Sequence, residues 1–253
     1  MSEKRKVDKK LRRKKRRILF IILLLIVVLF FLIAFKTTLF IISNIEVKGN
    51  MKITKDQIIK AIGNPKGENI FRVSLNNMTE NLNKHPYIKE SFIKRRIPNK
   101  LFINVNEREE KVVLSTANYN TYLDEEGFVL RIEPNVDNEK LPIIKGISIN
   151  NPILGEKITG DQNSHIDEML DLIDISIKLK LLNEMVQLDF SNVKDVTIIL
   201  NNGINVAFGP LNNVKYKLNY IDKILKDIEQ KNIQCNYIYF NRGENPVIVI
   251  DND

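Results

Sequence analysis

An uninterrupted apolar segment near the amino terminus constrains this chain more than any other feature of its sequence. It runs from Ile18 to Phe35, eighteen residues without a polar atom in any side chain. At 1.5 Å per residue, a helix of this length spans about 27 Å, close to the roughly 30 Å hydrocarbon core of a bilayer. All of these residues except Ala34 are Leu, Ile, Val or Phe, and each favours insertion by about 0.3 to 0.6 kcal/mol. We therefore predict a transmembrane helix over residues 18–38.

A dense group of cations precedes the apolar segment. Residues 1–17 contain eleven Lys or Arg against two acidic residues, and six of the cations are consecutive: Arg12, Arg13, Lys14, Lys15, Arg16 and Arg17. Short basic flanks of a transmembrane helix stay in the cytoplasm. The six cations therefore act as a topology signal that predicts a cytoplasmic tail at residues 1–17 and an extracytoplasmic remainder. The tail is expected to contact anionic lipid headgroups of the bilayer, and a docking site for a cytoplasmic partner is the alternative.

A cleaved signal peptide is the main alternative to a retained anchor. Such peptides have apolar regions of about 7 to 15 residues followed by a small-x-small cleavage site. Here the apolar run is longer and continues into Phe35-Lys36-Thr37-Thr38, which contains no such site. The sequence therefore favours a membrane protein that crosses the bilayer once.

The charge and cysteine content limit what the exported region can be. The tail has a net charge of +9 and the whole chain +8, so residues 18–253 carry −1. The basic isoelectric point belongs to the tail, and no nucleic-acid partner is predicted. Cys235 is the single cysteine, so no intramolecular disulfide can form and the exported region must be held together by packing.

The exported sequence first predicts a small domain of the order strand, helix, helix, strand, strand. Thr54 and Gln57 have the spacing of a capping box ahead of an apolar helical face. Leu101, Ile103 and Val105 alternate with polar or aromatic residues, as in a strand with one buried face. The predicted elements are a strand at 42–48, helices that begin after Thr54 and after Ser74, and strands at 88–96 and 100–107.

The second exported region predicts strands and two amphipathic helices. One helix has an apolar stripe of Ile166, Leu170, Ile173 and Ile177. The Asn202-Gly203 dipeptide predicts a type I′ hairpin. A later helix spans about 214–228, and its polar face is expected to carry Lys215, Lys217, Asp222, Lys226 and Glu229. Strands at 237–241 and 246–250, separated by a turn at 242–245, complete the region.

No catalytic or metal-binding motif was found. The chain has two histidines, His85 and His165, and neither belongs to a metal-ligand pattern. Asp167, Asp171 and Asp174 are expected on a solvated helix face, opposite the apolar stripe. No nucleophile with a neighbouring base can be named, so no catalytic residue, cofactor, metal or small-molecule substrate is predicted.

Three stretches carry a resemblance to a known family. They are Ile45-Glu46-Val47-Lys48-Gly49-Asn50, Pro86-Tyr87-Ile88-Lys89 and Lys94-Arg95-Arg96-Ile97-Pro98-Asn99-Lys100-Leu101-Phe102-Ile103-Asn104-Val105-Asn106-Glu107-Arg108. In this order, after an amino-terminal anchor, they resemble the FtsQ-type POTRA domain of the FtsQ/DivIB family of bacterial cell division proteins. Later segments at 122–130 and 141–146 are similar to the start of the family's second domain.

The resemblance implies an α+β fold: a single transmembrane helix, a POTRA domain (β-α-α-β-β) at 43–110, and a mixed α/β domain, the β domain, at 111–253 with a carboxy-terminal edge strand. It implies a non-enzymatic scaffold at the division septum that links FtsB/DivIC-like and FtsL-like bitopic proteins to septal peptidoglycan synthesis. In the family, these partners bind by strand addition. By position, the partner-binding residues would be Tyr237, Tyr239, Asn241, Val247 and Val249.

Alternatives remain open at this point. Val247, Val249, Tyr237 and Ile238 can also be read as ordinary core residues of the second domain. The chain could also be a POTRA-bearing envelope chaperone or secretion component, or a membrane-tethered enzyme of the cell envelope.

Overall fold

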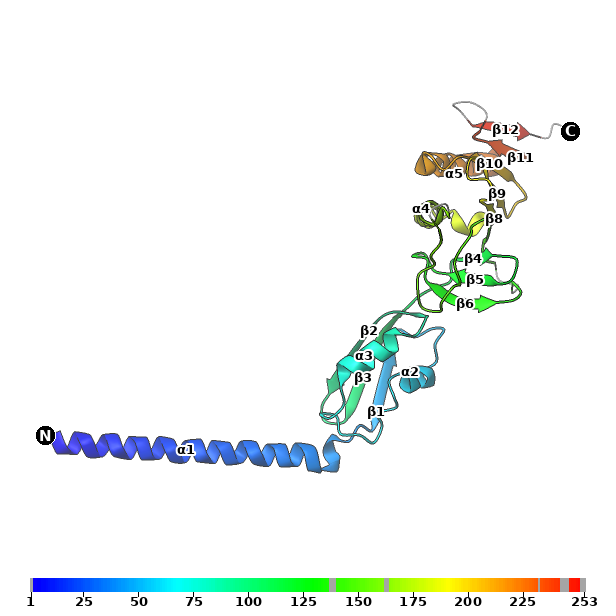
Figure 1. Cartoon of the computed structure of the whole chain (residues 1–253). Helices are drawn as coiled ribbons and strands as arrows, with labels where there is room; N and C mark the ends of the chain where they lie inside the picture. Colours follow the sequence, from blue (N-terminus) through cyan, green and yellow to red (C-terminus); the bar gives the residue numbers. More distant parts are fainter. Residues whose placement is uncertain (1, 137–139, 162–163, 232, 242–245, 251–253) are drawn as a thin grey trace. The chain divides into compact units, whose positions relative to one another are not determined.

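The computed structural model of the protein describes residues 2–136, 140–161, 164–231, 233–241 and 246–250 (Figure 1). The chain forms two compact units. The first consists of Met1–Asn83 and Glu90–Glu107, and the second of Lys84–Lys89 and Arg108–Asp253. The strand at Ile88–Arg96 is therefore divided: residues 88–89 belong to the second unit and residues 90–96 to the first.

Helix α1 spans Ser2–Lys36, so the predicted apolar helix is present and its helical conformation extends back through the basic segment. Its portion Lys14–Ile33 is long and apolar enough to cross a membrane. The side chains of Ile18 and Phe35 are exposed, as a surface meant for lipid requires. The helix ends two residues before the predicted boundary, where Thr37 is extended and precedes a short 3-10 turn, η1, at Thr38–Phe40.

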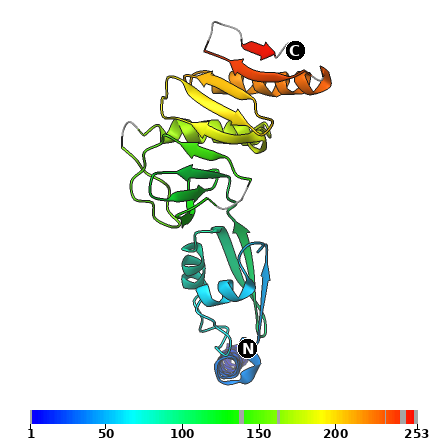
Figure 2. The ribbon, with the colours of Figure 1, turned by 90° about the vertical axis from the view of Figure 1, so that its right-hand side faces the viewer.

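The first unit contains a three-stranded sheet with two helices on one side (Figure 2). Its elements are β1 (Asn44–Lys48), α2 (Lys55–Ala61), α3 (Leu75–Asn83), β2 (Ile88–Arg96) and β3 (Lys100–Glu107). The strand order is β1-β3-β2, with β1 parallel to β3. The predicted order β-α-α-β-β is therefore confirmed.

Both helix starts in this unit follow the local signals in the sequence. The backbone N–H of Gln57 donates to Thr54 Oγ1 at 3.3 Å, and Gln57 Oε1 accepts from the Thr54 N–H at 2.8 Å, which completes the capping box. The Asn77 N–H likewise donates to Ser74 Oγ at 3.4 Å. Leu101, Ile103 and Val105 are buried beneath the helices, as their alternation predicts.

The second unit is a nine-stranded mixed sheet with both of its long helices on one side (Figures 1 and 2). The strand order is β12-β11-β10-β9-β8-β7-β4-β5-β6. The elements in chain order are β4 (Val112–Ser115), β5 (Asn120–Leu123), β6 (Val129–Glu133), β7 (Ile143–Lys145), α4 (Ile166–Lys178), η2 (Leu182–Glu184), β8 (Met185–Asp189), β9 (Val196–Leu200), β10 (Asn205–Gly209), α5 (Val214–Lys231), β11 (Cys235–Tyr239) and β12 (Val247–Ile250).

Helix α5 connects the parallel neighbours β10 and β11, as a parallel pair requires a crossover. It buries Leu218, Ile221 and Ile224 against the sheet. Helix α4 buries Ile166 and Ile173, as predicted. Met169 and Leu172 are also fully buried, whereas Leu170 and Ile177 are only partly buried. The buried stripe of α4 is thus rotated from the predicted one, because the polarisable Met169 side chain takes a core position.

Lys217 was predicted on the solvated face of its helix, and this prediction is wrong because the residue is buried. Its residue is 7% exposed. Its Nζ donates to the carbonyl oxygens of Phe208 at 3.0 Å and Pro210 at 2.6 Å, and to Asn212 Oδ1 at 3.1 Å. Burial lowers the pKa of this ammonium group, and the three acceptors compensate for its lost hydration.

The hairpin between β9 and β10 is present, but its turn is not the predicted type I′. A type I′ turn needs positive φ at both central residues. Here Gly203 has φ 87° and Asn202 is not among the residues with positive φ. The Leu200 and Ile204 backbones pair around a three-residue loop, and the Ile204 N–H donates to Asn202 Oδ1 at 3.2 Å. The asparagine side chain thus stabilises the longer turn.

A buried ion pair lies at the start of the second unit. Arg108 Nη1 pairs with Asp124 and, at 2.8 Å, with Glu126 Oε2. The Arg108 and Asp124 side chains are only 9% and 3% exposed. The guanidinium also stacks 3.5 Å from the ring centroid of Phe128. These contacts join the segment after β3 to the hairpin between β5 and β6.

Candidate functional site

Strand β12 forms one end of the nine-stranded sheet. It pairs antiparallel with β11 through four pairs of opposed residues: Tyr239 with Val247, Ile238 with Ile248, Tyr237 with Val249 and, after a register shift, Cys235 with Ile250. Among the described residues, no strand pairs with the other side of β12. The expected carboxy-terminal edge strand is therefore confirmed, and the turn predicted at 242–245 lies outside the described residues.

The register places four of the five candidate partner-binding residues on one face of the sheet. Directly opposed residues in an antiparallel pair share a face, and residues two apart on a strand do so as well. Tyr237, Tyr239, Val247 and Val249 meet both conditions. The tyrosine rings stack with their centroids 5.8 Å apart and their planes 13° from parallel. We call these four residues the tyrosine-valine patch.

The tyrosine-valine patch faces away from the helices. Ile238, which points to the other side, is fully buried in the core that includes α5. By contrast, Tyr237 is 44%, Val247 42% and Val249 40% exposed. The alternative that Val247, Val249 and Tyr237 are core residues is therefore excluded, whereas Tyr239 is half-buried and Ile238 is a core residue. Such an apolar surface beside an unpaired strand edge can accept an extended segment of another chain.

Asn241, the fifth candidate, lies beyond the end of β11 and outside the patch. Its Nδ2 donates to Asp195 Oδ1 at 2.9 Å. Asp195 belongs to the segment between β8 and β9, so this hydrogen bond ties the end of β11 to an inner part of the sheet. The structure thus assigns Asn241 a local structural contact and does not bring it together with the other four residues.

The exposed face continues inward over residues that the sequence did not single out. The register joins Val249, Tyr237, Asn205 and Ile199 in one row across four strands, and Val247, Tyr239, Ala207 and Thr197 in the next. The alternation of Val196 to Leu200 could have placed Ile199 on the outer face. The parallel pairing of β10 with β11 could not have been read from the sequence, because α5 separates these strands.

Cys235 lies at the start of β11, opposite Ile250, and its thiol is buried. Burial raises the pKa of this thiol, although a contact with the Tyr237 carbonyl partly opposes the shift. A raised pKa keeps the sulfur in its less nucleophilic protonated form. Within the described chain, no group of three or more His, Cys, Asp or Glu side chains could hold a metal ion.

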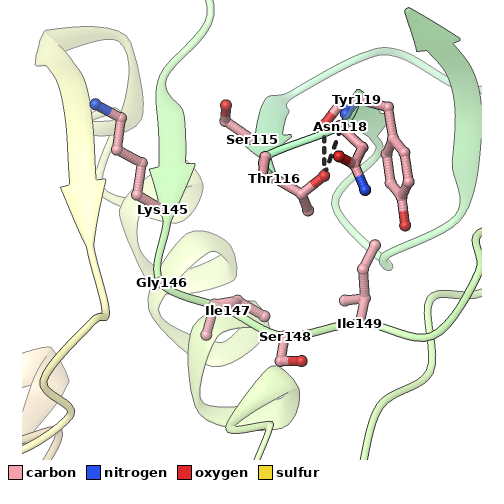
Figure 3. A pocket seen from close by; sticks show the side chains of 10 residues that line it. Ser115, Thr116, Asn118, Tyr119, Lys145, Gly146, Ile147, Ser148 and Ile149 are labelled. Atoms are coloured by element: carbon pink, nitrogen blue, oxygen red, sulfur yellow. Dashed lines mark hydrogen bonds between the residues drawn. The ribbon is translucent and has the colours of Figure 1, made fainter. Parts of the chain in front are cut away.

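A separate cavity of about 650 Å³ opens between the β4–β5 turn and the segment after β7 (Figure 3). Thr116 Oγ1 donates to the Tyr119 carbonyl at 2.8 Å and accepts from the Tyr119 N–H at 3.3 Å, so the turn is tied to itself. The Lys145 side chain points away from Tyr119. Lys145 is the single charged residue among the ten described residues that line the cavity, so they offer no acid and base pair.

Two protein-family models match the chain. A family model described as "POTRA domain, FtsQ-type" matches residues 40–108. A second model, "Cell division protein FtsQ/DivIB, C-terminal", matches residues 112–241. The first match covers the three-stranded unit, and the second covers the sheet as far as β11.

Individual proteins match over most of the chain. A cell division protein DivIB of Clostridium tetani is 31% identical over 219 residues, covering 86% of this chain and 82% of that protein. A DivIB of Clostridium botulinum is 32% identical over 222 residues, covering 87% and 85%. The solved extracytoplasmic domain of DivIB from Geobacillus stearothermophilus aligns with 49% of this chain and 97% of its own, at 13% identity and a TM-score of 0.32.

Proposed function

The chain belongs to the FtsQ/DivIB family of bacterial cell division proteins, and on that premise we propose that it is a non-enzymatic, membrane-anchored scaffold of the division machinery. In this role it links FtsB/DivIC-like and FtsL-like bitopic proteins to the complex that synthesises septal peptidoglycan. The POTRA domain occupies about residues 43–110 and the β domain about 111–253. The protein acts at the division septum.

The observation that carries the proposal is the free edge of β12 beside the tyrosine-valine patch. An incoming strand would extend the sheet through main-chain hydrogen bonds, and its side chains would contact Tyr237, Val247 and Val249. These three side chains are uncharged and 40 to 44% exposed. Charged residues are a common means of protecting a sheet edge from other strands, and β12 has none among Val247–Ile250.

The anchor makes modest interface affinities sufficient. We propose that the tail with Arg12–Arg17 stays in the cytoplasm and that both domains lie outside, with α1 crossing the bilayer. Partners that are themselves anchored share the same membrane plane with this chain. Confinement to one plane raises their effective concentration, so association at β12 needs less intrinsic affinity than it would in solution.

A cross-linked pull-down from dividing cells tests the scaffold. The variant Val247→Lys/Val249→Lys places two charges on the edge strand, where they oppose both strand pairing and apolar contact. We expect recovery of the FtsB- and FtsL-like proteins to fall at least about tenfold, which corresponds to about 1.4 kcal/mol of binding. A fluorescent fusion of the wild-type chain should concentrate at midcell.

Val186→Lys is the matched control. Val186 is also an exposed valine, at 45%, but it lies on β8, an interior strand. This variant should recover both partners at the wild-type level. Equal recovery by the β12 double variant and the wild type, with both folded by circular dichroism, would reject β12 as the binding edge.

A further inference from the structure

One end of the POTRA domain gathers the segments that lie next to the membrane anchor. The strand-like residues after η1 pair with the 67–70 segment, because the Ile70 N–H donates to the Phe40 carbonyl and the Ile42 N–H to the Glu68 carbonyl, both at 2.8 Å. The Ser43 N–H donates to the Asn99 carbonyl at 3.0 Å. The turn between β2 and β3 therefore sits at the same end as the entry of the chain. We call residues 38–44, 66–72 and 96–100 the anchor-side end.

Chain length limits how far the anchor-side end can lie from the bilayer. An extended chain covers at most about 3.6 Å per residue, so Leu39, four residues after Phe35, lies within about 14 Å of the end of the apolar segment. Ser43, whose N–H donates to the β2–β3 turn at Asn99, is eight residues after Phe35 and therefore lies within about 29 Å of the end of the apolar segment. The polar headgroup layer adds several ångströms on each side of the hydrocarbon core, which brings the turn within reach of headgroups.

The anchor-side end has a composition suited to a membrane surface. Leu39 and Ile97 are 56% and 57% exposed, although both are large apolar side chains. The three segments contain four cations (Lys66, Arg72, Arg96 and Lys100) and a single acidic residue, Glu68. All five charged residues are exposed.

The surroundings of these cations leave part of their charge uncompensated. Arg96 pairs with Glu46 of β1 at 2.5 Å and lies 4.2 Å from the ring centroid of Phe102. Lys66, Arg72 and Lys100 have no ion-pair partner among the described residues. They are therefore the cations best able to interact with an external anion.

The opposite end of the POTRA domain differs in charge. The β1 end there is followed by Met51, which is 94% exposed, and by Lys52, whose backbone N–H donates to Glu107 Oε2 at 2.7 Å. Residues 49–56 and 105–107 contain two cations and two acids, with no net charge. The excess of positive charge is thus specific to the end that adjoins the anchor.

We propose that the anchor-side end is a lipid-contacting surface that binds the phosphate groups of anionic phospholipids in the leaflet facing the POTRA domain. Leu39 and Ile97 enter the interface, and Arg72 and Lys100 contact the headgroup phosphates. The inference rests on the proposed function for the membrane anchor and the outward position of the domain. It adds a second, headgroup-dependent attachment that holds the POTRA domain against the membrane.

Fluorescence quenching in nanodiscs tests this contact with the full-length chain. Cys235→Ser provides a background without other thiols, and Ile97→Cys carries a fluorophore. The discs contain lipids with a nitroxide on the headgroup, in phosphatidylcholine alone or with phosphatidylglycerol. We expect strong quenching at position 97 that requires phosphatidylglycerol and decreases with added salt, because screening weakens exposed charges.

Arg72→Glu/Lys100→Glu should remove the dependence on phosphatidylglycerol, because each lost cation weakens attraction to an anionic surface about fivefold. Lys52→Glu/Lys55→Glu is the matched charge reversal at the opposite end and should leave it intact. A fluorophore at Met51→Cys should show little quenching in either lipid. Comparable quenching at 51 and 97, or equal quenching at 97 in both lipids, would overturn the proposal.

This test separates the lipid contact from the proposed function. Retention of the labelled chain in the discs reports the anchor, and capture of partners at β12 reports the scaffold. Arg72→Glu/Lys100→Glu changes neither readout if the two surfaces act independently. Absence of quenching at position 97 when Arg72 and Lys100 are both present, with the anchor and partner capture intact, would reject the lipid surface alone.

Discussion

At the scale of single residues, Arg108 forms the most deeply buried ion pair among the described residues of the second unit. Its guanidinium is enclosed by Asp124, Glu126 and the ring of Phe128. The Asp124 carboxylate is 3% exposed and also accepts the backbone N–H groups of Glu126 and Phe128, at 2.9 and 2.8 Å. The hairpin turn depends on this carboxylate, and the carboxylate depends on the arginine for its counter-charge.

We predict that Arg108→Met destabilises the β domain by about 3 to 5 kcal/mol, because a buried carboxylate would lose its partner. Urea unfolding followed by circular dichroism measures this loss. Lys178→Met is the control, since Lys178 pairs with Asp174 but is 71% exposed, and it should change stability by less than about 1 kcal/mol. Equal effects of the two substitutions would contradict the role assigned to Arg108.

Glu126 adds a dependence of stability on pH. The hydrogen bond from Arg108 lowers the pKa of this carboxyl group, with a smaller contribution from Lys89. A carboxyl group whose pKa is lower in the folded than in the unfolded state stabilises the folded protein at pH values above its unfolded pKa, which is about 4.3. This contribution is lost as the pH falls through the folded value. The β domain should therefore lose stability below about pH 5 partly through this residue.

The variant Glu126→Gln should show a shallower decrease in the urea midpoint between about pH 5 and pH 3 than the wild type. Glu229→Gln removes an exposed carboxylate of α5 and serves as the control for a general change in charge. If Glu126→Gln and the wild type lose stability in parallel over this range, the Arg108 hydrogen bond does not couple folding to pH.

Lys217 shows what residue patterns could not predict. Its position relative to Leu218 and Ile221 allows either a polar face or the border of the buried stripe. Lys217 is buried because the carbonyl oxygens of Phe208, in β10, and Pro210, in the loop before α5, accept hydrogen bonds from its Nζ. The capping box of Thr54 and Gln57 was predictable because all of its partners lie within four residues.

At the scale of elements, Gly49 controls how closely β1 approaches β3. It has φ +82°, and a Cβ placed there would lie 2.0 Å from the Val105 carbonyl oxygen. Gly63 has nearly the same φ, +84°, but a Cβ there would meet nothing within 4 Å. The pair therefore separates the cost of a left-handed conformation from the cost of a steric clash.

We predict that Gly63→Ala costs about 1 to 2 kcal/mol through conformation alone. Gly49→Ala should cost at least about 2 kcal/mol more, because the backbone of β3 must move away. Urea unfolding of both variants, with the change assigned to the POTRA domain, provides the comparison. Similar losses in the two variants would show that β3 yields to the added methyl group without strain.

Prediction from sequence was successful for elements whose residues are near one another in the chain. The order of the POTRA domain, the start of α3 at Ser74 and the hairpin around Gly203 all have local signals. The nine-strand order of the β domain does not, because β7 pairs with β4 on one side and with β8 on the other across long connections. Tyr237 and Tyr239 could be named as candidates from the sequence. Their pairing with Val249 and Val247 could not be derived, because it depends on the register between β11 and β12.

At the scale of the whole molecule, the proposed orientation rests on an asymmetry of charge. The tail has a net charge of +9 and the remainder −1. The apolar run of α1 begins where the basic tail ends, and the portion Lys14–Ile33 of this helix is long and apolar enough to cross a membrane. Positive charge close to a transmembrane helix stays on the cytoplasmic side, and on this ground we propose that both folded units lie outside.

Protease added to intact cells without a wall should digest the chain beyond about residue 38 and spare an epitope at the amino terminus. Immunoblotting of epitopes at the two ends measures this outcome. Replacement of Arg12–Arg17 by Ser and Gln should increase the fraction with the opposite orientation, because the charge difference across the helix decreases. Digestion of the amino-terminal epitope in the wild type would refute the orientation.

The reactivity of the buried Cys235 thiol reports how often β11 and β12 separate. Its sulfur is shielded where β11 meets Ile250 of the last strand, and its raised pKa keeps it protonated. Alkylating reagents reach such a thiol only during moments when the strands separate. The rate of alkylation therefore counts those openings, and a ligand that clamps β12 onto the sheet would slow the reaction without touching the sulfur.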